Sequence, residues 1–122
     1  MFTIAVEQDF SAAHQLREYQ GQCEHFHGHN WKVRLEVTTP DLDELGLGID
    51  FKDLKQALQQ VLEKFDHSFL NSLPDFADIN PTSENLARVI YRHCQQALEG
   101  SPVKMKAITV WESARAYVRY EE

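Results

Sequence analysis

Three histidines lie within five consecutive positions of the sequence, at His25, His27 and His29. In an extended segment, residues two positions apart point to the same side. His27 and His29 can therefore aim both imidazoles at one point, with Gly28 removing bulk between them. Zinc binds imidazole nitrogen, and a catalytic zinc has three protein ligands and an open fourth position. The alternative is that closely spaced surface histidines share no role, but the residues nearby favour a metal site.

Two residues are candidates for a third ligand. His14 ends the first expected strand on the same face as Phe10 and Ala12, so it can face ligands on a neighbouring strand. His25 shares the parity of the two other histidines of its run. The residues alone do not choose between His14 and His25.

The two cysteines have different surroundings. Cys23 either closes the metal site as a fourth ligand, or lies beside it as a thiolate that acts as base or nucleophile. Cys94 falls on the apolar stripe of an expected helix, which is typical of an inert core thiol. His93, beside it, is expected to be a helix residue and not a ligand.

Two further sites carry carboxylates suited to chemistry. Asp66 precedes His67, and a carboxylate next to an imidazole orients it for proton transfer, although a histidine at a helix C-terminus can also simply complement the helix dipole. Glu112 shares a strand face with Ile108 and Val110, where it could grip a guanidinium-like ligand in a bidentate pair. The alternative for Glu112 is a solvated residue at the end of a strand.

The elements that must position these residues follow from hydrophobic periodicity. Alternation of period two predicts strands, and apolar residues at i, i+3 and i+4 predict helices capped by Asp50 and Thr82, with Gly100 ending the second. The long polar segment 15–29 between the first two strands is expected to be a functional loop. The order of the elements, two strands, two helices and two strands, predicts an α+β fold with a four-stranded antiparallel sheet and two helices on one face. The expected elements are strands at 2–14, 30–39, 103–112 and 115–121, a helix at 51–65, and a second helix between the cap Thr82 and Gly100.

Size and charge restrict the class of protein. A chain of 122 residues is expected to form one domain spanning 1–122. Its net charge of −7 argues against a nucleic-acid or anionic-membrane partner, but does not exclude an anionic small substrate. No secretory signal or membrane span is evident, so we expect a cytoplasmic protein without a disulfide.

Taken together, these residues resemble the 6-pyruvoyl-tetrahydropterin synthase / 6-carboxytetrahydropterin synthase family over nearly the whole chain. Each piece is weak alone, but the ordered set is specific. The matching pieces are Phe10-Ser11-Ala12-Ala13-His14, Cys23 with His27-Gly28-His29-Asn30, Ile49-Asp50-Phe51, Asp66-His67 with Leu70-Asn71, Asn80-Pro81-Thr82-Ser83-Glu84-Asn85, and Glu112.

The resemblance implies a tunnelling fold, in which sheets join into a trimeric barrel, two trimers stack as a hexamer, and active sites lie at subunit interfaces. It implies Zn²⁺ held by His14, His27 and His29, leaving His25 out. Cys23 matches the family's proton acceptor. Asp66 and His67 match its acid–base partners, and Glu112 matches the carboxylate that grips the pterin.

Family members act on 7,8-dihydroneopterin triphosphate. The spacer of three residues between Cys23 and His27 resembles the carboxy-forming enzymes of queuosine biosynthesis, which also release acetaldehyde. Glu24 lies where a variant branch uses a glutamate to make a folate precursor, so it is a candidate substrate-binding residue. The alternatives are therefore pyruvoyl or folate-precursor formation, or, in another class, a non-catalytic protein with a structural Cys-His₃ zinc.

Overall fold

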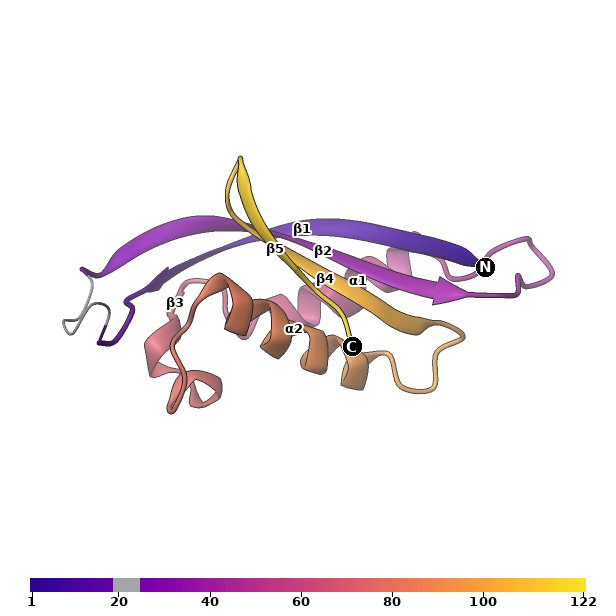
Figure 1. The fold of residues 1–122 in the computed structure, drawn as a ribbon. Coiled ribbons are helices and arrows are strands. Elements are labelled where there is room, and N and C mark those ends of the chain that lie inside the picture. Colours follow the sequence, from indigo (N-terminus) through magenta and orange to yellow (C-terminus); the bar gives the residue numbers. More distant parts are fainter. Residues whose placement is uncertain (19–24) are drawn as a thin grey trace.

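The computed structural model describes residues 1–18 and 25–122, which form one sheet and two α-helices (Figure 1). Two short 3-10 helices, Leu70–Ser72 and Pro74–Phe76, lie between the third strand and the second helix. The strands are β1 (Phe2–His14), β2 (His27–Thr39), β3 (Ser68–Phe69), β4 (Lys104–Ser113) and β5 (Ala116–Tyr120), and the helices are α1 (Phe51–Leu62) and α2 (Ser83–Ala97).

The sheet has the strand order β3-β1-β2-β4-β5. All neighbours are antiparallel except β3, which runs parallel to β1 through the pairs Ala12 with Ser68 and Ala13 with Phe69. The four long strands confirm the α+β prediction. The fifth, β3, was not predicted, because two residues are too few to show a period-two pattern.

Both helices begin where the sequence predicts. Asp50 accepts a hydrogen bond from the Lys52 amide and Thr82 accepts one from the Asn85 amide, so each cap satisfies an otherwise unpaired donor. The first helix ends earlier than expected, at Leu62, and residues 63–67 form turns. Gly100, just beyond the second helix, has φ +82°, a conformation that glycine adopts without strain.

Both helices cover the same face of the sheet (Figure 1). Their apolar stripes pack on the inward-facing residues of the strands, and this layer excludes water from the core. The fully buried members include Val33, Leu35 and Val37 of β2, Leu54 and Leu58 of α1, Leu86 and Ile90 of α2, and Ile108 and Val110 of β4.

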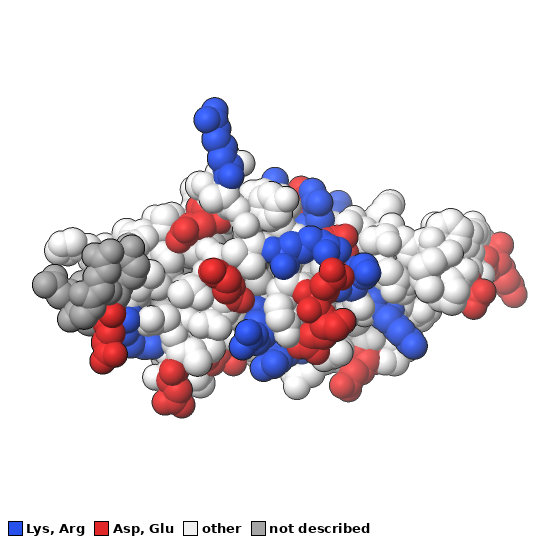
Figure 2. All heavy atoms as spheres, viewed as in Figure 1, with Lys and Arg blue, Asp and Glu red and all other residues white. Residues whose placement is uncertain are grey.

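The opposite face of the sheet is covered by charged side chains that pair with one another. Arg34 donates to Glu7 at 2.7 Å, and Arg119 donates to Glu36 at 2.9 Å. In the side view of Figure 2, basic and acidic side chains lie interspersed across the visible surface, with no extended basic patch on the side of the molecule that the view shows. None of the helices in residues 1–18 and 25–122 is long and apolar enough to cross a membrane.

One long edge of the sheet is open. Beyond the two residues that pair with β3, the outer edge of β1 from Phe2 to Phe10 has no strand beside it in the described part of the chain. On the far side, β5 is the last strand. Exposed strand edges readily pair with a further strand, so both edges are available for a second copy of the chain.

Candidate metal centre and active site

Four side chains from three strands converge at one end of the helix-covered face. His14 ends β1, His27 and His29 begin β2, and Glu112 lies near the end of β4. Each offers one ligand atom, and these atoms all lie within 4.8 Å of one another. The register explains the convergence, since His14 pairs with His27 and Ala12 with His29, which places all three histidines on one face.

The distances fit a common metal ion. Two nitrogens bound at the usual zinc distance and the tetrahedral angle are about 3.3 Å apart. Nε2 of His14 lies 3.1 Å from Nε2 of His27 and 3.1 Å from Oε1 of Glu112. Nε2 of His29 lies 3.5 Å from the same Glu112 oxygen. Three imidazoles and a carboxylate are a donor set that a divalent ion such as zinc accepts.

Backbone carbonyls orient two of the imidazoles. Nδ1 of His14 lies 2.8 Å from the Pro81 carbonyl, and Nδ1 of His27 lies 2.9 Å from the His25 carbonyl. A carbonyl oxygen can only accept, so each Nδ1 carries the proton and each Nε2 keeps its lone pair for the cluster. His25 thus contributes its backbone, and its side chain is not in the cluster.

Trp31 lies under the histidines. Its ring centroid is 5.1 Å from that of His14 and 5.3 Å from that of His29, and its indole N–H donates to the Ala12 carbonyl at 3.2 Å. The ring is fully buried, and His14 is only 3% exposed. The apolar ring keeps water away from one side of the cluster, which strengthens the electrostatic interactions there.

Gly28 does not have the steric role that the sequence suggests. A Cβ added at Gly28 would meet no atom within 4 Å, so the glycine does not relieve crowding between the histidines. It borders a cavity of about 360 Å³ together with Ser11, Ala13 and His67. By strand alternation, Ser11 and Ala13 face away from the histidines, and the missing side chain leaves room in this cavity.

The second predicted pair, Asp66 and His67, lies along the outer edge of β1. Oδ1 of Asp66 accepts from the Ser11 amide at 2.9 Å, and Oδ2 lies 3.0 Å from Nδ1 of His67. These contacts lower the pKa of Asp66, chiefly through the Ser11 hydrogen bond and to a smaller extent through His67. Asp66 therefore stays ionised and holds Nδ1 of His67, whose other nitrogen is left for proton exchange.

His67 has a strained backbone and an exposed ring. Its φ of +56° is uncommon for a residue other than glycine, and its amide donates to the Ser11 carbonyl at 2.6 Å. The side chain is 83% exposed. Such a conformation persists only where the surroundings impose it, and it is often found at functional sites.

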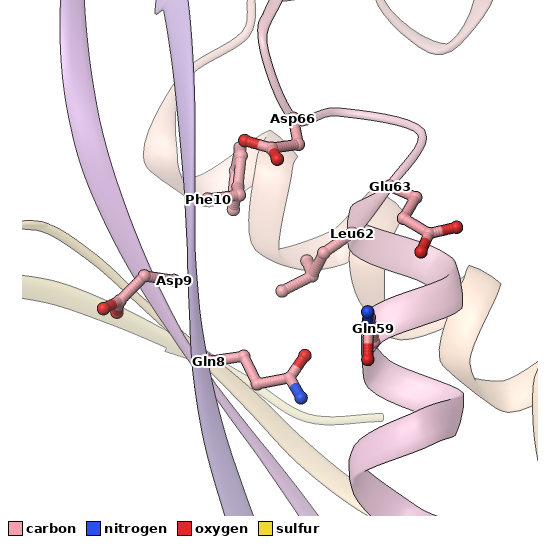
Figure 3. Close-up of a pocket in the computed structure, with 7 residues that line it drawn as sticks. All are labelled: Gln8, Asp9, Phe10, Gln59, Leu62, Glu63 and Asp66. Carbon is pink, nitrogen blue, oxygen red and sulfur yellow. The ribbon is translucent and has the colours of Figure 1, made fainter.

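The two sets of residues are separate within one chain. The His67 backbone lies one strand spacing from β1, and that of His29 on β2 lies one spacing further, so about 10 Å separates these two backbones. The outer edge of β1 also borders a second cavity, of about 400 Å³, between this strand and α1. Figure 3 shows Asp66 at one end of it and Gln8 extending from the strand toward Gln59 on the helix.

The remaining predicted residues have the following places. Cys94 is 1% exposed, and burial raises the pKa of its thiol to about 12, so it is unreactive at neutral pH. His93 lies between Lys64 and Asp75, at 3.3 and 3.2 Å, away from the cluster. Cys23 and Glu24 lie outside the described residues.

Sequence reasoning missed three contributors to the metal centre. The Pro81 carbonyl and the His25 carbonyl are backbone groups, which leave no residue-type signal. Trp31 could have been found, because it shares the strand parity of His27 and His29.

Comparison with known proteins finds relatives that match nearly the whole chain. The family model for 6-pyruvoyl tetrahydropterin synthase matches residues 3–122. A Synechocystis protein named 6-carboxy-5,6,7,8-tetrahydropterin synthase is 33% identical over 98% of this chain and 93% of its own. A 6-pyruvoyl tetrahydrobiopterin synthase from Poecilia reticulata is 34% identical over 77% of this chain and 74% of its own.

The fold is also shared with solved structures. The structure of 6-pyruvoyl tetrahydropterin synthase from Caenorhabditis elegans superposes with a TM-score of 0.85 at 22% identity, covering 99% of this chain and 95% of the other. This likeness identifies the tunnelling fold. With the match over residues 3–122 and the close relatives, the chain belongs to the 6-pyruvoyl tetrahydropterin synthase family.

Proposed function

We propose that the protein is a zinc-dependent 6-carboxy-5,6,7,8-tetrahydropterin synthase. It would convert 7,8-dihydroneopterin triphosphate to 6-carboxytetrahydropterin, acetaldehyde and triphosphate, as a step of queuosine biosynthesis in the cytoplasm. The observation that carries the proposal is the convergence of His14, His27, His29 and Glu112 within 4.8 Å. The carboxy-forming relative is matched over 98% of this chain, against 77% for the pyruvoyl-forming one.

His14, His27 and His29 would hold the zinc, because their ligand atoms all lie within 4.8 Å of one another. Nε2 of His14 and Nε2 of His27 are 3.1 Å apart, close to tetrahedral spacing, and the Nδ1 atoms of these two residues face backbone carbonyls. A bound zinc supplies Lewis acidity, which makes neighbouring C–H and O–H groups of the substrate side chain easier to deprotonate. The three imidazoles are neutral donors, so the centre keeps a positive charge that favours an anionic triphosphate substrate.

Asp66 and His67 would move protons. Asp66 holds Nδ1 of His67, so Nε2 is the atom that takes or gives a proton. Cys23 is proposed as the companion proton acceptor on the strength of the family resemblance. A proton-transfer partner must come within about 2.6–3.2 Å of the reacting atom, whereas the backbones of His67 and His29 in one chain are about 10 Å apart.

We therefore propose that the pair of one copy serves the histidine cluster of another. The open edge of β1 and the outer strand β5 favour strand pairing between copies. The predicted assembly is the family's homohexamer, a dimer of trimers, with residues 1–122 as the single domain of each subunit.

Glu112 is proposed to bind the pterin, with Glu24 as a further substrate contact. The Glu112 carboxylate lies against His14 and His29, at 3.1 and 3.5 Å, where a fourth ligand would be. It is 37% exposed, so it can turn away from the histidines. A carboxylate accepts two parallel hydrogen bonds from a guanidine-like edge such as the amino-pyrimidine of a pterin.

One observation favours a second candidate. If Glu112 stays bound, the ion has four protein ligands and the site is closed, as in structural zinc sites. This differs from the Cys-His₃ site considered from sequence, but has the same consequence, a non-catalytic protein. It predicts that removal of zinc unfolds the chain.

The test is to incubate the zinc-loaded protein with 7,8-dihydroneopterin triphosphate and identify the products by mass spectrometry. The proposal predicts equal amounts of 6-carboxytetrahydropterin and acetaldehyde. A pyruvoyl product without acetaldehyde, or a 6-hydroxymethyl product, would identify another branch of the family. No consumption of substrate by protein containing one zinc per chain would contradict the proposal and favour the structural site.

A further inference from the structure

Beyond His14 the outer edge of β1 is paired by side chains instead of a strand. Oδ1 of Asn71 accepts from the Gln15 amide at 2.9 Å, and its Nδ2 donates to the Gln15 carbonyl at 2.7 Å. Asn80 makes the same two hydrogen bonds with Arg17, at 2.8 and 3.0 Å. Each carboxamide thus replaces the peptide group of a neighbouring strand, and it satisfies the backbone N–H and C=O groups of Gln15 and Arg17.

Arg17 joins the two asparagines. Its Nη1 donates to the Ile79 carbonyl and its Nη2 donates to the Asn71 carbonyl, both at 3.0 Å. The guanidinium has a fixed fork of donors, so it holds these two carbonyls in one geometry. Six hydrogen bonds therefore tie residues 15–17 to the segment 71–80.

Asn80 has a connection that Asn71 lacks. It directly precedes Pro81, whose carbonyl accepts the hydrogen bond from Nδ1 of His14 at 2.8 Å. The carbonyl of Asn80 itself accepts from Nδ2 of Asn85 at 2.9 Å. Asn80 is thus held through its side chain by Arg17 and through its backbone by Asn85, and the Pro81 carbonyl is fixed in turn.

We propose that Asn80 is a positioning residue for the metal centre, acting on His14 through the Pro81 carbonyl. Because this carbonyl fixes the proton on Nδ1 of His14, it keeps Nε2 as the nitrogen that faces the cluster. His14 is almost fully buried, so no water can replace the carbonyl at low cost. Outer partners of metal-bound histidines change metal affinity by about 10–100-fold when they are removed.

Asn71 is the matched control. It makes the same pair of hydrogen bonds to the same segment, but with Gln15, which is two residues nearer to His14 in the chain than Arg17. It is half-buried like Asn80. It neighbours no carbonyl that His14 uses. Replacing either asparagine by alanine removes two backbone pairings, so the effect of lost pairing can be separated from the effect on His14.

The inference rests only on the metal-binding part of the proposed function. The experiment compares the parent protein with Asn80→Ala and Asn71→Ala, by zinc competition with a chromophoric chelator, the visible absorption spectrum of the Co²⁺-substituted protein, and urea unfolding. We expect both variants to lose stability. Only Asn80→Ala should bind zinc at least about tenfold more weakly and show an altered cobalt spectrum.

Equal zinc affinity and equal cobalt spectra in the two variants would overturn the inference. If the parent still binds zinc in that case, the proposed function is unaffected. A parent protein that binds no zinc would contradict both. If Asn80→Ala does not fold, Asn85→Ala replaces it, because that change frees the Asn80 carbonyl without touching the pairing with Arg17. It should weaken zinc binding in the same direction, and an unchanged affinity would overturn the inference.

Discussion

The histidine cluster and the Asp66–His67 pair differ in how completely one chain builds them. His14 is buried, its ring nitrogen is held by Pro81, and all the ligand atoms of the cluster come from three paired strands. His67 is 83% exposed, lies in a turn after α1 and has a left-handed backbone. Within residues 1–18 and 25–122, the ligand atoms of the first site are assembled by one chain, whereas the His67 ring of the second site is largely exposed.

This difference indicates a division of roles. A metal site needs fixed geometry, which strand register and outer hydrogen bonds supply. A proton-transfer group needs access to the reacting atoms and a suitable protonation state. Asp66 orients the His67 ring through the contact between Oδ2 and Nδ1, and the ring is exposed enough to reach a substrate.

The largest effect is expected from His29→Ala. Loss of a ligand should weaken zinc binding by more than about 100-fold, since even outer partners cost 10–100-fold, and activity should be lost with the metal. Metal analysis after gel filtration measures this. The control is His25→Ala, which keeps the carbonyl that orients His27 and should retain zinc. Loss of zinc in His25→Ala, or full zinc in His29→Ala, would break the assignment of the cluster.

His67→Asn should reduce activity without affecting zinc binding. Activity should fall by about 10²–10⁴-fold, as for a lost general acid or base, while zinc content stays at the parent level. Asparagine tolerates the left-handed backbone, so the fold should be kept. His67→Ala should lose similar activity and a further ~1 kcal/mol of stability in urea unfolding. Parent-like turnover in His67→Asn would remove the pair from the mechanism.

Glu112→Gln tests whether Glu112 binds the zinc or the substrate. With three imidazoles holding the ion, we expect zinc to remain bound and the KM for substrate to rise, because the amide cannot accept both hydrogen bonds from the pterin edge. Steady-state kinetics and zinc competition measure the two effects. If zinc is lost as in His29→Ala while the chain unfolds, Glu112 is a closing ligand and the site is structural.

The smallest effect is expected from Asp66→Asn on stability. Because the folded pKa of Asp66 lies below 3.8, its ionised form stabilises the fold above that pH, and this contribution is lost as the pH falls through the folded pKa. The variant should be less stable than the parent at pH 7, and the difference should shrink at lower pH. Urea unfolding between pH 7 and 3 measures it, and a difference that grows on acidification would contradict the assigned charge.

Much of the fold could be predicted from the sequence, because its signals are local. Alternation marks the four long strands, and Asp50 and Thr82 mark the starts of the helices. Parity placed the histidines on one face. β3 was missed because it is held by pairing with Ala12 and Ala13 and has no pattern of its own.

The site was less predictable because it depends on contacts distant in the chain. Glu112 was placed on its strand face, but its approach to His14 and His29 follows from the register of three strands. The steric role given to Gly28 was wrong, since its Cβ direction is open. The roles of Cys23 and Glu24 stay predictions.

The most direct test of a cluster served by another copy's proton pair is complementation. His29→Ala and His67→Asn, each inactive alone, are co-expressed with different tags, and the mixed oligomers are purified through both tags. If each site combines residues of two copies, about a quarter of the sites in random mixtures contain an intact cluster and an intact pair. Activity should return to that level. Mixed oligomers that bind zinc but stay as inactive as the single variants would contradict the shared site.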